Sequence, residues 1–170
     1  MKPSRRTFLA VLLAASVVPQ TAVSAEAANP VEIVKGIYRR AAAGTGESGG
    51  QFLWLKPADR RRAFTASLVD AWAKADKRTP KGDQGPMSFD PVTNSQDPCL
   101  KDFRVTEEAA GPANARVVVS MVECGGARPS PADGIVRYLF RRERGQWRID
   151  DIQGAIDGRG WSVREMLARH

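Results

Sequence analysis

The spacing of apolar residues changes near residue 100, and this change limits the possible fold more than any other feature of the sequence. Between residues 30 and 78, apolar side chains recur three or four positions apart, as on one face of an α-helix. From Phe103 onward they alternate with polar side chains, as in strands that bury one face. The pattern predicts an α+β fold, with N-terminal helices packed on one face of a curved antiparallel sheet of about four strands.

Capping residues set the limits of the predicted helices. Asn29 and Pro30 suit the start of a first helix, and Gly44 suits its end. A second helix is expected to begin near Pro57. Its buried stripe is expected to contain Phe64, Leu68, Trp72 and Ala75. A short C-terminal helix is expected after Ser162, which opens the capping-box sequence SVRE.

A loop and four strands fill the rest of the predicted domain. Residues 78–98 are rich in Pro, Gly, Asp and Asn, which predicts a loop long enough to be functional. The predicted strands are 103–105, 117–122, 135–142 and 147–152. A first hairpin that turns at Gly111-Pro112 places Cys99 opposite Cys124. These are the chain's two cysteines, and they predict one disulfide, with two free thiols as the alternative.

The second hairpin suggests a candidate catalytic pair. A two-residue turn at Arg144-Gly145 is favourable because glycine readily adopts a positive φ. The predicted pairs are Arg142 with Trp147, Phe140 with Ile149, and Tyr138 with Asp151. This register places Asp151 on the apolar face beside Tyr138. The two could act as a base and an oxyanion donor in an isomerase-type site, or they could form a purely structural pair.

The first residues resemble an export signal. Lys2, Arg5 and Arg6 precede the apolar run 8–18, and small residues follow at 23–25. The pattern SRRTFL resembles the twin-arginine signal, with a general secretory signal as the alternative. Residues 1–25 are therefore predicted to be cleaved, leaving 26–170 as a single periplasmic or secreted domain. The apolar run is too short to predict a permanent membrane anchor.

Composition argues against several classes of function. Without the signal the chain is only mildly basic, and an exported protein has no nucleic acid to bind, so we expect no nucleic-acid partner. The one histidine, His170, ends the chain. Two distant cysteines and one terminal histidine do not fit a zinc site or a Ser-His-Asp or Cys-His site. We therefore expect no metal and no cofactor.

Two stretches resemble a known superfamily. Helices followed by the hairpin YLFRRERGQWRIDDI, residues 138–152, resemble the nuclear transport factor 2-like cone. Within that superfamily, FDPVTNSQD, residues 89–97, is similar to a family of exported bacterial proteins known only as a domain of unknown function. The resemblance implies a cone-shaped sheet, a pocket between sheet and helices, and a mouth lined by loops. The superfamily includes enzymes, binding modules and interaction proteins, so it implies no particular chemistry. The histidine-aspartate pairs of its dehydratases cannot form here.

The candidate ligand-binding residues fall into two groups. Tyr138, Trp147 and Asp151 belong to the second hairpin and would face the pocket. Four more lie in the 89–97 stretch at the expected mouth, namely Asp90, Asn94, Gln96 and Asp97. Such residues also commonly cap turns, which is the structural alternative.

The sequence thus predicts an exported, cofactor-free module that binds a small ligand or a periplasmic protein, as a monomer or a homodimer. One alternative is a small isomerase- or hydrolase-type enzyme that uses Asp151 as base with Tyr138. A second alternative is a periplasmic immunity-type protein that meets its partner through exposed basic runs. These runs are Arg39-Arg40, Arg60-Arg61-Arg62 and Arg141-Arg142.

Overall fold

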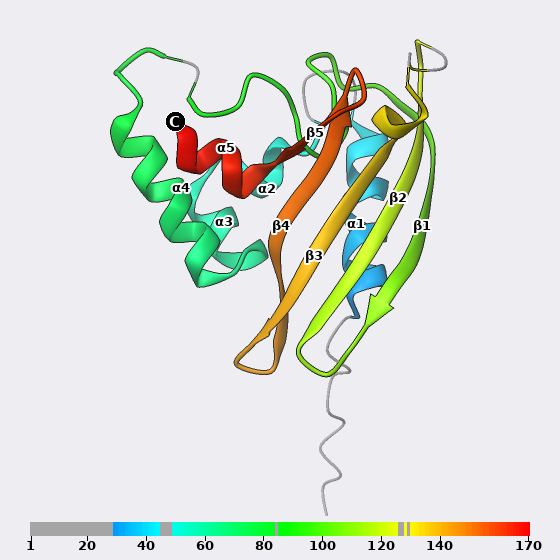
Figure 1. The fold of residues 1–170 in the computed structure, drawn as a ribbon, viewed down its shortest axis with the longest axis horizontal. Helices are drawn as coiled ribbons and strands as arrows, with labels where there is room; N and C mark the ends of the chain where they lie inside the picture. Colours follow the sequence, from blue (N-terminus) through cyan, green and yellow to red (C-terminus); the bar gives the residue numbers. More distant parts are fainter. Residues whose placement is uncertain (1–28, 45–48, 84, 126–127, 129) are drawn as a thin grey trace, which may run out of the picture.

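The structure is a computed structural model that describes residues 29–44, 49–83, 85–125, 128 and 130–170 of the chain. The predicted export signal, with Arg5 and Arg6, lies outside these residues. Helices precede strands, as expected (Figure 1). The elements are α1 (Pro30–Ala43), α2 (Gln51–Trp54), α3 (Pro57–Ala63), α4 (Ala66–Arg78), β1 (Leu100–Ala110), β2 (Asn114–Glu123), the 3₁₀ helix η1 (Pro131–Gly134), β3 (Ile135–Glu143), β4 (Gln146–Ile156), β5 (Arg159–Ser162) and α5 (Val163–Arg169).

Within the described residues, five strands form one antiparallel sheet in the chain order β1-β2-β3-β4-β5. Helix α1 lies across one face of this curved sheet, and α3, α4 and α5 lie beside β4 (Figure 1). The predicted α+β class and the short C-terminal helix are confirmed. Strand β5 was not predicted because its four residues, RGWS, are too few to show a period.

The first helix forms where its caps predict. The Asn29 side chain accepts a hydrogen bond from the Glu32 backbone N–H at 2.9 Å, and Pro30 occupies the first turn. Helix α1 ends before Gly44. It buries one stripe of side chains against the sheet, made of Val34, Ile37, Tyr38 and Ala41.

The second predicted helix is in fact two helices, α3 and α4, separated by an extended step at Phe64 and Thr65. Phe64 forms a parallel bridge with Ile149 of β4, and the Thr65 N–H donates to the Ile149 carbonyl at 2.9 Å. Thr65 then caps α4 by accepting from the Leu68 N–H. Pairing with the sheet edge thus breaks a helix that spacing alone makes continuous. The four residues of the predicted stripe are all buried, with Phe64 in the break and the other three on α4.

A β-bulge changes the predicted register between β3 and β4. The pair Phe140–Ile149 is confirmed, but the next pairs are Leu139–Asp151 and Tyr138–Ile152. Asp150 is therefore the extra residue on β4. Its carboxylate accepts a hydrogen bond from the Thr65 hydroxyl at 2.9 Å and forms ion pairs with Arg141 and Arg164. These partners hold Asp150 out of the ladder, so the predicted pairing of Tyr138 with Asp151 is wrong.

Aromatic rings fill the layer between α1 and the sheet. The Tyr38 ring centroid lies 5.4 Å from that of Phe103 and 6.1 Å from that of Tyr138. The ring of Tyr138 in turn lies 6.5 Å from that of Phe140. Most side chains that face this layer from α1 and the sheet are almost fully buried, and Phe103 is half-buried. The helix-facing side of the sheet is therefore a packed core around these rings.

Candidate functional site

A cleft of about 490 Å³ opens at the end of the sheet that carries η1 and the β4–β5 turn. Residues 88–97 form one wall, the end of β2 and Arg128 form another, and Asp133 with the β4–β5 turn form the third. Asn94, Gln96 and Asp97 of the predicted ligand-binding residues line this cleft. The fourth residue of that group, Asp90, lies below it in the base of the loop.

Asp90 holds the base of the 88–97 loop. Its carboxylate accepts hydrogen bonds from the backbone N–H groups of Gly50 at 2.6 Å and Val92 at 3.2 Å, and from the Thr93 hydroxyl at 2.9 Å. A Cβ atom at Gly50 would lie 2.8 Å from this carboxylate, so the close approach requires glycine. Asp90 is 4% exposed and acts as a turn cap, which is the structural alternative for this residue type.

Asn94 fixes the cleft wall to the sheet. Its backbone has a φ of 54°, in the left-handed region that asparagine tolerates better than most residues. Its side-chain amide donates to the Asp133 and Ala155 carbonyls at 2.8 and 2.6 Å. The amide oxygen accepts from the Trp161 indole N–H at 2.9 Å. The polar atoms of this buried side chain are thus committed to the fold.

Residues that were not predicted from the sequence complete the cleft. The buried Asp133 carboxylate accepts from the N–H groups of Asp157 and Gly158 at 3.1 and 2.9 Å, which closes the β4–β5 turn. Glu123 pairs with Arg128, whose guanidinium also donates to the Thr93 carbonyl. The turn-forming sequence SPADG gave a local signal for Asp133. Glu123 and Arg128 are only five residues apart, but no motif in the sequence predicts their ion pair.

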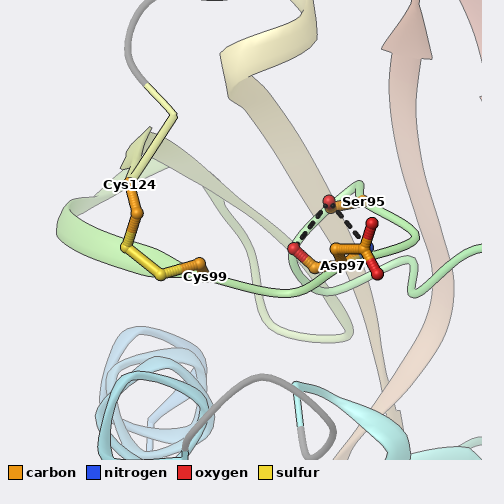
Figure 2. The surroundings of a disulfide bond; sticks show 4 residues. All are labelled: Ser95, Asp97, Cys99 and Cys124. Carbon is orange, nitrogen blue, oxygen red and sulfur yellow. Dashed lines mark hydrogen bonds between the residues drawn. A yellow bond between two sulfur atoms is a disulfide. The ribbon is translucent and has the colours of Figure 1, made fainter.

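Gln96 and Asp97 stand on the rim. Both are exposed, and their side chains make no hydrogen bond or ion pair with the other described residues. The Ser95 hydroxyl holds the backbone at this point: it accepts from the Asp97 N–H at 3.2 Å and donates to the Asp97 carbonyl at 3.1 Å (Figure 2). The rim is therefore fixed while its side chains stay available to a ligand.

The predicted disulfide between Cys99 and Cys124 is confirmed (Figure 2). Their Cα atoms lie 5.5 Å apart, and the Cys124 N–H donates to the Cys99 carbonyl at 3.2 Å. Cys99 lies two residues after Asp97, and Cys124 directly follows Glu123. The disulfide therefore joins two walls of the cleft.

The cleft carries an excess of negative charge on a chain whose net charge is +7. Its acidic lining residues are Asp97, Glu123, Asp133 and Asp157, and its basic lining residue is Arg128. Because Glu123 is paired with Arg128 and Asp133 is hydrogen-bonded, Asp97 and Asp157 remain to attract a ligand. The cleft suits a ligand with a cationic or hydrogen-bond-donating group.

Tyr138 and Asp151, the candidate catalytic pair, are not brought together. Tyr138 lies in the aromatic core, where burial raises the pKa of its hydroxyl well above the usual value and the neighbouring Tyr38 acts in the same direction.

The Asp151 carboxylate accepts hydrogen bonds from the Ser162 hydroxyl at 2.7 Å and the backbone N–H of Arg164 at 3.1 Å. It also accepts from the Ile152 N–H and the Gln153 side chain, both at 2.9 Å. Asp151 therefore anchors the start of α5.

Trp147 does not join the cleft residues either. It is half-buried beside the β3–β4 turn, at the opposite end of these strands from the cleft. The Arg142 guanidinium lies 5.4 Å from its ring centroid, which suits a cation–π contact. The structure thus brings three of the seven predicted ligand-binding residues to one cleft.

Three further findings concern the possible function. Among the described residues, no group of three or more His, Cys, Asp or Glu side chains is placed to hold a metal ion. None of the described helices is long and apolar enough to span a bilayer. Comparison with known protein families, with curated proteins and with solved structures finds no match to this chain.

Proposed function

We propose that this chain is an exported binding module that takes a small polar ligand, with a cationic or donor group, in the cleft between the 88–97 loop and the β4–β5 turn. One observation carries the proposal. The cleft is supported by buried side chains whose hydrogen bonds are made within the fold, while the side chains of Gln96 and Asp97 on its rim make none with the other described residues. Such pre-organisation lowers the entropic cost of binding.

The geometry favours binding over catalysis. The alternative enzyme needs Asp151 beside Tyr138, but Asp151 is committed to α5 and Tyr138 to the core. A general base must reach the proton that it removes. Asp90 and Asp133 are buried and hydrogen-bonded to backbone groups, which leaves them equally unsuited to proton transfer.

Native mass spectrometry of the protein purified from its own periplasm tests this proposal. We expect a co-purified small molecule that is retained by wild type and lost from Asp97→Asn and Gln96→Ala. Glu107→Gln is the matched control, because Glu107 is exposed on β1 outside the cleft lining. A bound mass that survives both rim substitutions, or the absence of any bound mass, argues against this site.

Export belongs to the same proposal, and the disulfide supports it because such bonds persist in oxidising compartments. Replacing both Arg5 and Arg6 by lysine keeps the charge but removes the twin-arginine pattern. We expect this variant to stay in the cytoplasm, as judged by fractionation and immunoblotting. Undiminished periplasmic yield would indicate a general secretory signal.

The nuclear transport factor 2-like cone is our proposal for the superfamily. A curved antiparallel sheet that follows N-terminal helices is compatible with it. In that setting the cleft corresponds to the loop-lined mouth, and the aromatic layer between α1 and the sheet occupies the usual place of the pocket. An experimental structure that superposes on a cone domain would test the assignment.

A further inference from the structure

A second and larger groove, of about 770 Å³, lies between helices α3 and α4 and the β3–β4 hairpin. Its floor is apolar, with the buried Phe64 and the half-buried Val69. Its rim is basic, with the guanidinium groups of Arg61, Arg144 and Arg148. An apolar floor beneath several arginines suits a molecule that has an anionic group at one end and hydrocarbon at the other.

The arginines differ in how far the fold uses them. Arg148 donates to the Arg62 carbonyl and to the Gln146 side chain, so it is fixed on the groove wall. Arg61 and Arg144 are exposed and have no hydrogen bond or ion pair within the described part of the chain. Two guanidinium groups are thus free to form bidentate hydrogen bonds with an added anion.

A carboxylate of the protein already lies in the groove. Glu143 accepts a hydrogen bond from the Ala66 N–H at 3.1 Å, at the start of α4. Its negative charge, with that of Asp70 on the same lining, opposes the binding of a second anion. Removing either charge should therefore strengthen anion binding in the groove. Anion binding to a basic surface far from these residues should not change.

We propose that this groove binds a phosphate ester with a short apolar chain, whose phosphate contacts Arg61 and Arg144 and whose hydrocarbon lies on Phe64 and Val69. The site is separate from the cleft and does not depend on the cleft's ligand. The same chemistry is present in soluble alkyl phosphates and in the headgroups of anionic lipids.

Isothermal titration with hexyl phosphate and with inorganic phosphate tests the proposal. Hexyl phosphate should bind about tenfold more tightly than phosphate, because its chain buries apolar surface. Arg61→Gln and Arg144→Asn should each weaken its binding about tenfold, the effect of losing a hydrogen bond to a charged group. Asparagine suits position 144, where φ is 51°, so the turn should be kept.

Charge-removing variants make the test specific. Glu143→Gln keeps an oxygen acceptor for the Ala66 N–H, and it should tighten binding about threefold through the loss of one nearby negative charge. Asp70→Asn should act in the same direction without touching the start of α4. Arg104→Gln, an exposed arginine of β1 outside the groove, is the control and should bind like wild type.

Vesicles identify the source of the phosphate. Binding to phosphatidylglycerol vesicles, with the same dependence on Arg61 and Arg144, supports the proposal with a lipid as the ligand. Binding of hexyl phosphate alone supports it with a soluble ester. The proposal would be overturned if neither hexyl phosphate nor the vesicles bound. Equal losses of binding in Arg104→Gln and Arg61→Gln would also overturn it.

Discussion

Tyr38 and Tyr138 are the two tyrosines of the chain, and both are fully buried. The Tyr38 hydroxyl donates to the Val92 carbonyl at 2.6 Å, whereas the Tyr138 hydroxyl has no hydrogen-bond partner among the described residues. A buried polar group without a partner is unfavourable, but a satisfied one contributes to stability. The same substitution should therefore have different effects at the two positions.

We expect Tyr138→Phe to leave the free energy of unfolding unchanged or to raise it. Tyr38→Phe should lower that free energy by about 1 kcal/mol, since the Val92 carbonyl loses its donor. Urea unfolding followed by circular dichroism measures both, and each variant serves as the control for the other. Equal losses at the two positions would mean that the Tyr138 hydroxyl has a partner such as a buried water.

The tyrosines also predict how stability depends on pH. Burial raises the pKa of both hydroxyls above the usual value of about 10. Below that value both states are protonated and the full stability is present. Above it the unfolded chain loses protons that the folded chain keeps, so stability falls as pH rises.

Tyrosinate absorbance should consequently appear only as the protein unfolds. We expect it to rise together with the loss of near-ultraviolet circular dichroism in an alkaline titration. A Tyr38→Phe, Tyr138→Phe variant should lose less stability above pH 10 than wild type does. Tyrosinate absorbance that rises while the protein remains folded would contradict the burial of these hydroxyls.

At the scale of the elements, Asp151 connects the sheet to α5. Asp151→Asn keeps the shape of the side chain but faces an NH₂ group toward donors such as the Ser162 hydroxyl. We expect a loss of about 1–3 kcal/mol in the free energy of unfolding, with unchanged binding in the cleft. Asp102→Asn is the control, because Asp102 is exposed and, within the described part of the chain, accepts only from the adjacent Phe103 N–H. Lost ligand in a variant of unchanged stability would assign Asp151 a functional role.

The disulfide connects the ends of β1 and β2. A Cys99→Ser, Cys124→Ser variant should fold but lose about 2–4 kcal/mol of stability, because its unfolded state is less restricted. It should also bind the cleft ligand more weakly, since two walls are no longer joined. Thiol titration of the unreduced, denatured wild type checks the premise, and two free thiols per chain would contradict it.

The parts of the fold that could be predicted are those set by local pattern. Asn29 and Ser162 cap helices as predicted, because a cap depends on a few neighbouring residues. The break at Phe64 and the bulge at Asp150 could not be predicted, since both depend on contacts between distant parts of the chain. The bulge alone separates Asp151 from Tyr138, so one inserted residue removes the catalytic hypothesis.

The same distinction applies to the cleft. The 89–97 motif identified one wall, because Asp90 and Asn94 are turn-forming residue types in a loop rich in them. Asp133 lies in a turn-forming sequence, but its place beside the 89–97 loop depends on a hydrogen bond between distant parts of the chain. The ion pair of Glu123 with Arg128 follows no motif that the sequence shows. The position of the cleft therefore required the sheet.

At the scale of the whole molecule, the cleft and the arginine groove lie at opposite ends of β3 and β4. Strands of this length separate the two sites by about 30 Å. The cleft lining has an excess of acidic side chains and the groove lining an excess of arginines, so the two sites contribute a dipole along the strands. Near an anionic surface this contribution favours an orientation in which the groove faces the surface and the cleft faces the solution. The long axis of the sheet is then the direction along which these two sites act on the protein's orientation.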